Sequence, residues 1–316
     1  MSPKRQNISG LTGIKLLETV NAIKALLAKW EAEHVDEMDG DIDPDRLRAV
    51  LDMLTARMDP SSMWAEHLET LNIYWSGELK LKPESRSRAL ATDSVVEEEL
   101  WSADGLYRHL CLLEGIVPRN NEAAARLWIE AFFFRVASMS PGTSKLVLSV
   151  DPNVLPIPSG PLSAISGNTL SGHLNFMAIL TSERHAWHLL HLQRPVTGPE
   201  DRAFFVAEAK GPDLILDKHV PQALCEMHAC AKRLNKTIIR GALTNGIEWI
   251  FMVLVLDQDG DGGKYFESEH IKLRRLADEG GEVSREASSL IAAVIAYWIE
   301  HSHEEIGSDD YLTMAL

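Results

Sequence analysis

A carboxylate and an ammonium group stand two residues apart near the middle of the chain. Residues 204–207 form an apolar run of strand length; Glu208 and Lys210 follow it, and Gly211-Pro212 ends the strand. Residues two apart on a strand point to one face, so Glu208 and Lys210 would lie together. Such a pair suits phosphodiester hydrolysis. The carboxylate would hold a divalent metal ion, and the lysine would position or deprotonate a water or stabilise developing charge.

Regular elements are expected on the C-terminal side of this pair. Gln222–Leu234 has apolar residues at three-four spacing and predicts a helix. Thr237–Leu243 predicts a strand, Thr244-Asn245-Gly246 is a hairpin turn signal, and Ile247–Leu256 predicts the partner strand. The expected order is therefore strand, helix, strand, turn and strand.

Other elements are expected before the pair. Asn121-Glu122 opens a predicted helix over Ala123–Ala137, and Leu146–Val150 predicts a short strand. Gly172–Leu180 predicts a further strand, which carries Asn175. Glu122 could equally be a carboxylate in the first helical turn, where it favours the helix dipole.

This order of elements and residues resembles the PD-(D/E)XK nuclease superfamily, over roughly Glu122–Leu256. The resemblance implies an α/β (α+β) fold with a restriction-endonuclease-like mixed central sheet flanked by helices. It implies that Glu208 and Lys210 carry the chemistry, that Glu122 is the family's helix Glu, and that Gln222 is its later Gln. It also implies Mg²⁺ or Mn²⁺ as the cofactor and DNA or RNA as the substrate.

The sequence departs from the family at the strand before Glu208. Where the family has an Asp, this chain has Asn175, which leaves Asn175 and Glu208 as the implied metal ligands. An Asn keeps one oxygen ligand but removes a full negative charge, so affinity for a hard dication should fall. Other carboxylates that could substitute lie outside the family's spacing: Asp151, Glu183, Asp201 and Asp213.

The composition is that of an ordinary globular protein. Of 316 residues 45% are hydrophobic and 24% are charged. No apolar run approaches about 20 residues, so no membrane span is expected. The three cysteines give no disulfide framework and predict a reducing, intracellular location, cytoplasmic or nuclear.

The net charge of −15 is unevenly distributed. Residues 1–116 have 13 basic and 21 acidic side chains, a net charge of −8, and residues 257–316 have 5 and 14, a net charge of −9. Residues 117–256 have 13 and 11, a net charge of +2, so the nuclease-like block lacks the acidic excess. Because nonspecific affinity for nucleic acid comes largely from neutralised phosphates, the acidic parts disfavour tight binding without excluding it.

The N-terminal third is expected to be an all-α region, residues 1–116, followed by a nuclease-like domain, residues 117–316. The segments with helical spacing are 11–33, 45–58, 63–79 and 93–113. The polar stretch Lys80–Thr92 is the expected boundary within this third. Ser284–Glu300 predicts a final helix, and the acidic residues after it are expected to fray.

Two further patterns invite a metal-binding interpretation. His185, His188 and His191 do not share one helix or strand face, so surface or core histidines are expected there rather than a zinc site. Asp257–Gly262 matches the start of a calcium loop, but position twelve is Ser268 and the preceding stretch is strand-like. A turn between strands is the favoured interpretation.

Three hypotheses remain open at the level of sequence. The first is an active metal-dependent nuclease. The second is a catalytically inactive relative that uses the fold as a binding module, through nucleic acid or through a protein partner at the acidic helical N-terminal region. The third is an unrelated α/β protein in which Glu208 and Lys210 form an ordinary salt bridge.

Overall fold

The computed structural model describes residues 65, 68–91, 101–118, 122–140, 142–150, 174–192, 203–209, 215–257, 262–274 and 282–315. The chain divides into two compact units. One unit, Leu71–Val154 with Gly172–Leu316, contains every element named below. Of the other, Met1–Thr70 with Leu155–Ser171, only residues 65 and 68–70 are described. The helices expected over 11–33 and 45–58 therefore lie outside the described residues.

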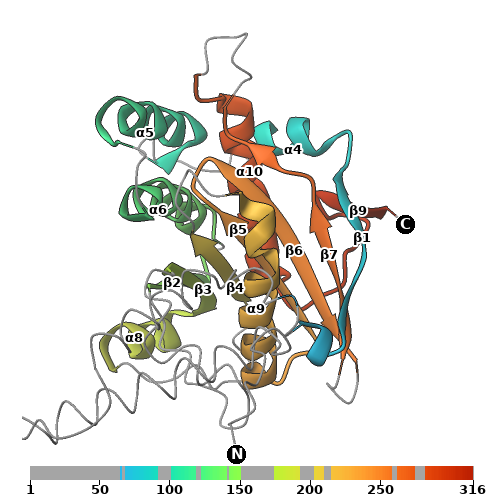
Figure 1. The fold of residues 1–316 in the computed structure, drawn as a ribbon. Helices are drawn as coiled ribbons and strands as arrows, with labels where there is room; N and C mark the ends of the chain where they lie inside the picture. The colour runs from blue at the N-terminus through green and yellow to red at the C-terminus, as the bar shows by residue number, and fades with distance from the viewer. Residues whose placement is uncertain are drawn as a thin grey trace, which may run out of the picture. The chain divides into compact units, whose positions relative to one another are not determined.

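The described residues form a nine-stranded sheet with helices packed against it (Figure 1). Its strands are β1 (Ile73–Leu81), β2 (Ser144–Val150), β3 (Leu174–Ser182), β4 (Ala203–Ala209), β5 (Ile238–Thr244), β6 (Glu248–Leu256), β7 (Gly263–Ser268), β8 (Ile271–Lys272) and β9 (Leu312–Ala315). Their order is β2-β3-β4-β5-β6-β7-β1-β9, with β8 also paired to β6. The sheet is mixed, because β4 pairs with β5 and β1 with β7 in parallel while the other neighbours are antiparallel. The protein is thus an α+β protein with a mixed sheet flanked by helices, as the sequence predicts at that level.

The helices are α4 (Ser85–Ala91), α5 (Ala103–Ile116), α6 (Glu122–Met139), α8 (Glu183–Leu192), α9 (Val220–Leu234), α10 (Arg285–Glu300) and the 3₁₀ turn η4 (Leu216–His219). Side-chain caps fix two of their starts. Ser102 accepts a hydrogen bond from the Gly105 amide at α5, and Ser284 accepts one from the Ala287 amide at α10. At the end of α9, Asn235 adopts the left-handed conformation that terminates helices. None of the described helices is long and apolar enough to cross a membrane.

Helices α6 and α10 cover one face of the sheet through aromatic contacts. On β6, Trp249 packs edge-on against Phe132 of α6, and Phe251 packs against Trp298 of α10. Helix α9 links β4 to the parallel strand β5 and contacts β4, β5 and β6. In Figure 1, α9 lies in front of the sheet and α10 behind it. The core is therefore concentrated between the sheet and the α6–α10 layer, which also contacts α5 and α4.

The turn between β5 and β6 is built by its side chains and by close packing. The Asn245 side-chain oxygen accepts hydrogen bonds from the amides of Ile247 and Glu248. Gly246 has a φ of +85°, and a Cβ placed there would lie 2.7 Å from the Cβ of Trp128 on α6. Glycine is required at this position because both the backbone angle and the space exclude a side chain.

A buried ion pair holds the C-terminal segment. Arg240 on β5 donates to Asp310 at 2.6 Å, and the side chains are 1% and 0% exposed. The other carboxylate oxygen of Asp310 accepts from the indole of Trp298 and from the Leu312 amide. Arg240 also donates to the backbone carbonyls of Glu304 and Glu305. This network fixes the chain just before β9.

Four expectations for the ends of the chain are wrong where the structure describes them. The helix expected over Met63–Leu79 is helical where described at residues 65 and 68–70, but the chain is strand β1 from Ile73 on, so the N-terminal third is not all-α. Its alternating burial is a strand pattern, and β1 pairs with β7, which lies nearly 200 residues later. The expected boundary Lys80–Thr92 contains the end of β1 and helix α4, which packs on α10. The residues after α10 were expected to fray, but their last part is β9, which pairs with β1.

Candidate functional site

The register of the sheet brings two of the proposed metal ligands opposite each other. Strands β3 and β4 are antiparallel neighbours (Figure 1). Asn175 is the direct partner of Glu208 in their register. Directly opposed positions in an antiparallel pair share a face, so the two positions lie next to each other on the same face of the sheet. Their side chains lie outside the description of the structure. The pairing of Asn175 with Glu208 is therefore established by the backbone register of β3 and β4.

These two positions lie on the face opposite α6. Phe176, the residue after Asn175, packs against Phe133 of α6 with ring centroids 5.6 Å apart. Successive residues on a strand alternate between faces, so the positions of Asn175 and Glu208 lie on the other face. The next position across the sheet from Glu208 is Leu243 of β5, which is fully buried.

Gln222 is placed by helix α9 at the same end of the sheet. Because α9 connects two parallel strands, its first turn lies beyond the carboxyl end of β4, where Glu208 is located. Pro221 is at the start of that turn, where its missing amide is not needed. Gln222 is buried, at 2% exposure, and its side-chain amide donates to the carboxylate of Glu226 at 3.1 Å.

Glu122 is brought to the same end of the sheet but by the opposite layer. It is the first residue of α6, whose early turns pack against the β5–β6 turn at Gly246. That turn follows Thr244, the partner of Ala209 beside Glu208. The side chain of Glu122 is outside the description.

The remaining sequence candidates divide into two groups. Lys210 lies outside the described residues, as do Asp151, Asp201 and Asp213. Glu183 is described and lies at the far end of the sheet from Asn175, because it follows Ser182 at the other end of β3. It is exposed and is 4.0 Å from Lys145. Glu183 is therefore not part of the site.

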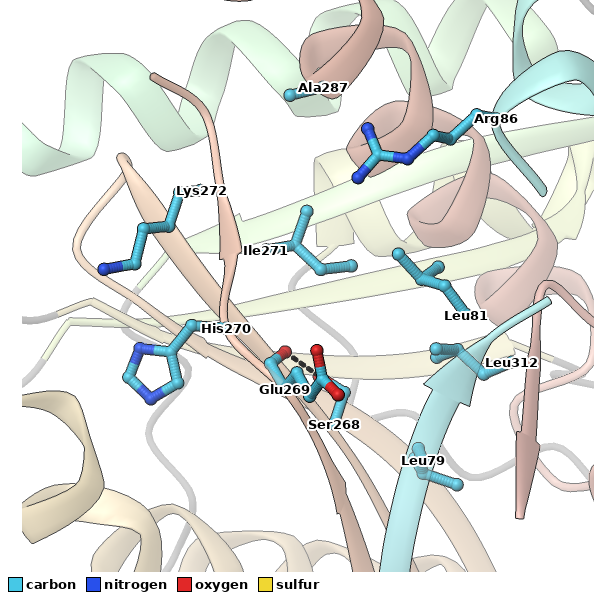
Figure 2. Close-up of a pocket in the computed structure, with 10 residues that line it drawn as sticks. All are labelled: Leu79, Leu81, Arg86, Ser268, Glu269, His270, Ile271, Lys272, Ala287 and Leu312. Carbon is cyan, nitrogen blue, oxygen red and sulfur yellow. Dashed lines mark hydrogen bonds between the residues drawn. The ribbon is translucent and has the colours of Figure 1, made fainter. Parts of the chain in front are cut away.

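A histidine between two carboxylates was not predicted from the sequence. The His270 Nε2 atom lies 2.9 Å from Asp217 of η4, and its Nδ1 atom lies 3.2 Å from Glu248 of β6. Lys272 of β8 is 3.3 Å from the other oxygen of Glu248. These residues are far apart in sequence, and only the fold brings them together. Figure 2 shows His270 and Lys272 on one side of a small pocket and Arg86 of α4 on the other.

A further carboxylate follows on the next strand. Glu267 of β7 is opposite Met252 on β6 and Glu78 on β1. Burial first, and then the charge of Asp217, raise the pKa of Glu267. This face of the sheet thus carries several acidic groups beyond Leu243, on the side away from Asn175.

The three histidines of the possible zinc pattern lie on α8. Trp187 packs against the rings of His188 and His191, with centroids 5.4 Å and 5.0 Å apart. Within the residues that the structure describes, no group of three His, Cys, Asp or Glu side chains is arranged to hold a metal ion. The calcium-like stretch is flanked by strands β6 and β7 rather than by helices, and its residues 258–261 lie outside the description.

Comparison with models of known protein families, with curated proteins and with solved structures finds no match for the chain. The chemical argument must therefore come from the arrangement itself. An amide and a carboxylate position are paired at one end of the sheet, and a buried glutamine lies in the first turn of the adjoining helix. A histidine between two carboxylates lies on the same face, on the far side of β5.

Proposed function

We propose that this protein is a nuclease of the PD-(D/E)XK kind, which hydrolyses phosphodiester bonds of nucleic acid at the end of the sheet near Asn175 and Glu208. The observation that carries the proposal is the direct pairing of these two positions on β3 and β4. Two oxygen ligands on adjacent strands, close to the end of the sheet, are a suitable platform for a metal ion and a phosphate.

The order of elements supports a restriction-endonuclease-like fold as part of this proposal. Helix α6 begins with Glu122 and precedes three antiparallel strands, β2, β3 and β4. Helix α9 follows with Gln222 in its first turn and leads to β5, which is parallel to β4. This is the order that the resemblance implies for the helix Glu, the strand ligands and the later Gln.

The donor atoms at the paired positions fit a hard cation in type. Glu208 offers a carboxylate and Asn175 an amide oxygen, and both kinds of oxygen suit Mg²⁺ or Mn²⁺. A bound ion of this kind would supply Lewis-acid stabilisation of the phosphate and a more acidic water. Lys210 would position or deprotonate that water, and Gln222 and Glu122 would support the ligands from the two helices.

A second candidate function is favoured by charge. Asn175 provides no negative charge for the metal, and the same face carries Asp217, Glu248 and Glu267, which oppose the approach of a phosphate backbone. Under this alternative the fold is a catalytically inactive binding module. Its partner would be nucleic acid, or a protein recognised through the acidic residues 1–116.

The test is a cleavage assay on single- and double-stranded DNA and RNA with Mg²⁺ or Mn²⁺. We expect metal-dependent cleavage by the wild-type chain and its loss in Glu208→Ala. Glu183→Ala is the matched control, because it removes an exposed carboxylate at the other end of β3 and should leave cleavage unchanged. Well-folded wild-type protein that binds nucleic acid without cleaving it, with or without metal, would support the binding module instead.

A further inference from the structure

His270 lies in an irregularity between two short strands that both pair with β6. Met252 is opposite Glu267 on β7, and Trp249 is opposite Ile271 on β8. The three residues between Glu267 and Ile271 therefore face only the two residues between Trp249 and Met252 on β6. Such an extra residue is a β-bulge, which shifts the alternation of side chains by one. The Ser268 hydroxyl stabilises the bulge by accepting from the Phe251 amide and donating to the Glu269 carbonyl.

The bulge changes the face to which His270 belongs. Ile271 pairs with Trp249, whose ring packs against α6, so the preceding residue His270 is on the other face. That face carries Glu248, and the η4 turn lies over it with Asp217. The extra residue therefore directs the imidazole between these two carboxylates.

The hydrogen bonds of His270 require a specific protonation state. A neutral imidazole has one N–H donor and one acceptor nitrogen, whereas ionised carboxylates only accept. Both ring nitrogens lie within hydrogen-bonding distance of a carboxylate oxygen, at 2.9 Å and 3.2 Å. The doubly protonated ring alone satisfies both contacts. Burial lowers the pKa of His270, but the hydrogen bonds to Asp217 and Glu248 outweigh it and raise the pKa above its ordinary value.

We propose that protonated His270 is a positioning residue that fastens η4 to β6 and thereby holds the first turn of α9, which contains Gln222. The η4 turn ends at His219 and α9 begins at the next residue, so no linker separates the fastened turn from the helix. The buried side chains of Leu216 and Val220 anchor the same segment by apolar contact. His270 adds a contact that depends on pH.

The groups around His270 set the direction of this dependence. They are Asp217 of η4, Glu248 of β6, Glu267 of β7 and Lys272 of β8, with the exposed ion pair of Arg86 and Glu286 from α4 and α10 across the pocket. The folded-state pKa of His270 is raised, so the fastening is complete below the ordinary histidine pKa of about 6.5. It is lost as the pH rises through the raised value.

The first test is an NMR titration of the His270 side chain in the full chain. We expect its pKa to lie above about 6.5 and to fall in Asp217→Asn, which removes one of the two charges. A pKa at or below that of an ordinary histidine, or one that Asp217→Asn leaves unchanged, would overturn the proposal.

The second test is amide hydrogen exchange of residues 216–220 and of Gln222, corrected for intrinsic exchange rates, at pH values below and above the measured pKa. We expect protection to fall by about two- to fivefold with rising pH, the range of a partly exposed ion pair, and to be insensitive to pH in His270→Gln. His191→Gln on α8 is the matched control and should behave as wild type. An equal pH dependence in His270→Gln would overturn the proposal.

The consequence for catalysis rests on the proposed function, but these two measurements do not. If the chain cleaves nucleic acid, the wild-type cleavage rate should fall as the pH rises through the His270 pKa. This fall should be absent in His270→Gln. If the chain does not cleave, exchange and NMR still decide whether His270 positions α9, so failure of one proposal is distinguishable from failure of the other.

Discussion

Removal of Asp310 should destabilise the protein strongly, because it leaves the charge of Arg240 buried without its partner. Both side chains are essentially inaccessible, and their atoms are 2.6 Å apart. Breaking a buried pair by deleting one partner costs about 3–5 kcal/mol. Asp310→Ala also deprives the Trp298 indole and the Leu312 amide of their acceptor, so the upper half of that range is expected.

The assay is reversible urea unfolding, in which a change in midpoint at constant slope reports the change in stability. The matched control is Glu305→Ala, which removes an exposed carboxylate of the same segment and keeps the backbone carbonyl that Arg240 binds; it should change the free energy of unfolding by less than about 1 kcal/mol. The double variant Arg240→Met/Asp310→Ala leaves no unpaired charge, so its loss should be clearly smaller than the sum of the single losses.

A loss below about 1 kcal/mol for Asp310→Ala would refute this reasoning, as would additivity of the two single changes. Either result would mean that water reaches the pair or that β9 separates from β1 without affecting the core. The C-terminal segment would then be frayed, as expected from the sequence.

Two other perturbations test separate parts of the fold. Gly246→Ala should lower the free energy of unfolding by about 2–4 kcal/mol in the same assay, because the added Cβ would sit at a left-handed backbone angle and 2.7 Å from Trp128. An unchanged urea midpoint would contradict the packing of α6 on this turn. The pKa of Glu267 is raised, so its stabilising contribution is present at low pH and is lost as the pH rises through the raised value. Glu267→Gln should therefore raise the thermal midpoint at neutral pH by about 2 °C and have less effect near pH 4. Glu269 is exposed, so the control variant Glu269→Gln should leave the thermal midpoint unchanged at both pH values. A lower thermal midpoint of Glu267→Gln at neutral pH would contradict the argument.

The elements around the proposed site were predictable because their signals are local. Residues 204–207 form an uninterrupted apolar run, and Asn245-Gly246 marks the hairpin that follows; both fall where the structure has β4 and the β5–β6 turn. Helix α9 follows from the three-four spacing of its apolar residues. The presence of Asn175 on the strand before Glu208 was predicted, but its direct pairing with Glu208 depends on the length of the chain between β3 and β4 and could not be.

The features that the sequence did not predict depend on contacts between residues that are far apart in the chain. Strand β1 was assigned to a helix because its apolar residues also fit helical spacing, and its partner β7 follows nearly 200 residues later. Asp310 lies in an acidic stretch, and its burial depends on the ion pair with Arg240, which is distant in sequence. His270 acquires its role through a single extra residue in the strand edge, and no pattern in the sequence indicates that bulge.

Metal affinity at the paired positions tests the central claim most directly. Titration calorimetry with Mn²⁺ should compare the wild-type chain with Asn175→Asp and with Glu208→Ala. If the two positions hold one metal ion, Asn175→Asp adds a negative ligand and should tighten binding by about tenfold or more, while Glu208→Ala should abolish it. Equal affinity in all three proteins would contradict the claim that Asn175 and Glu208 form a metal site.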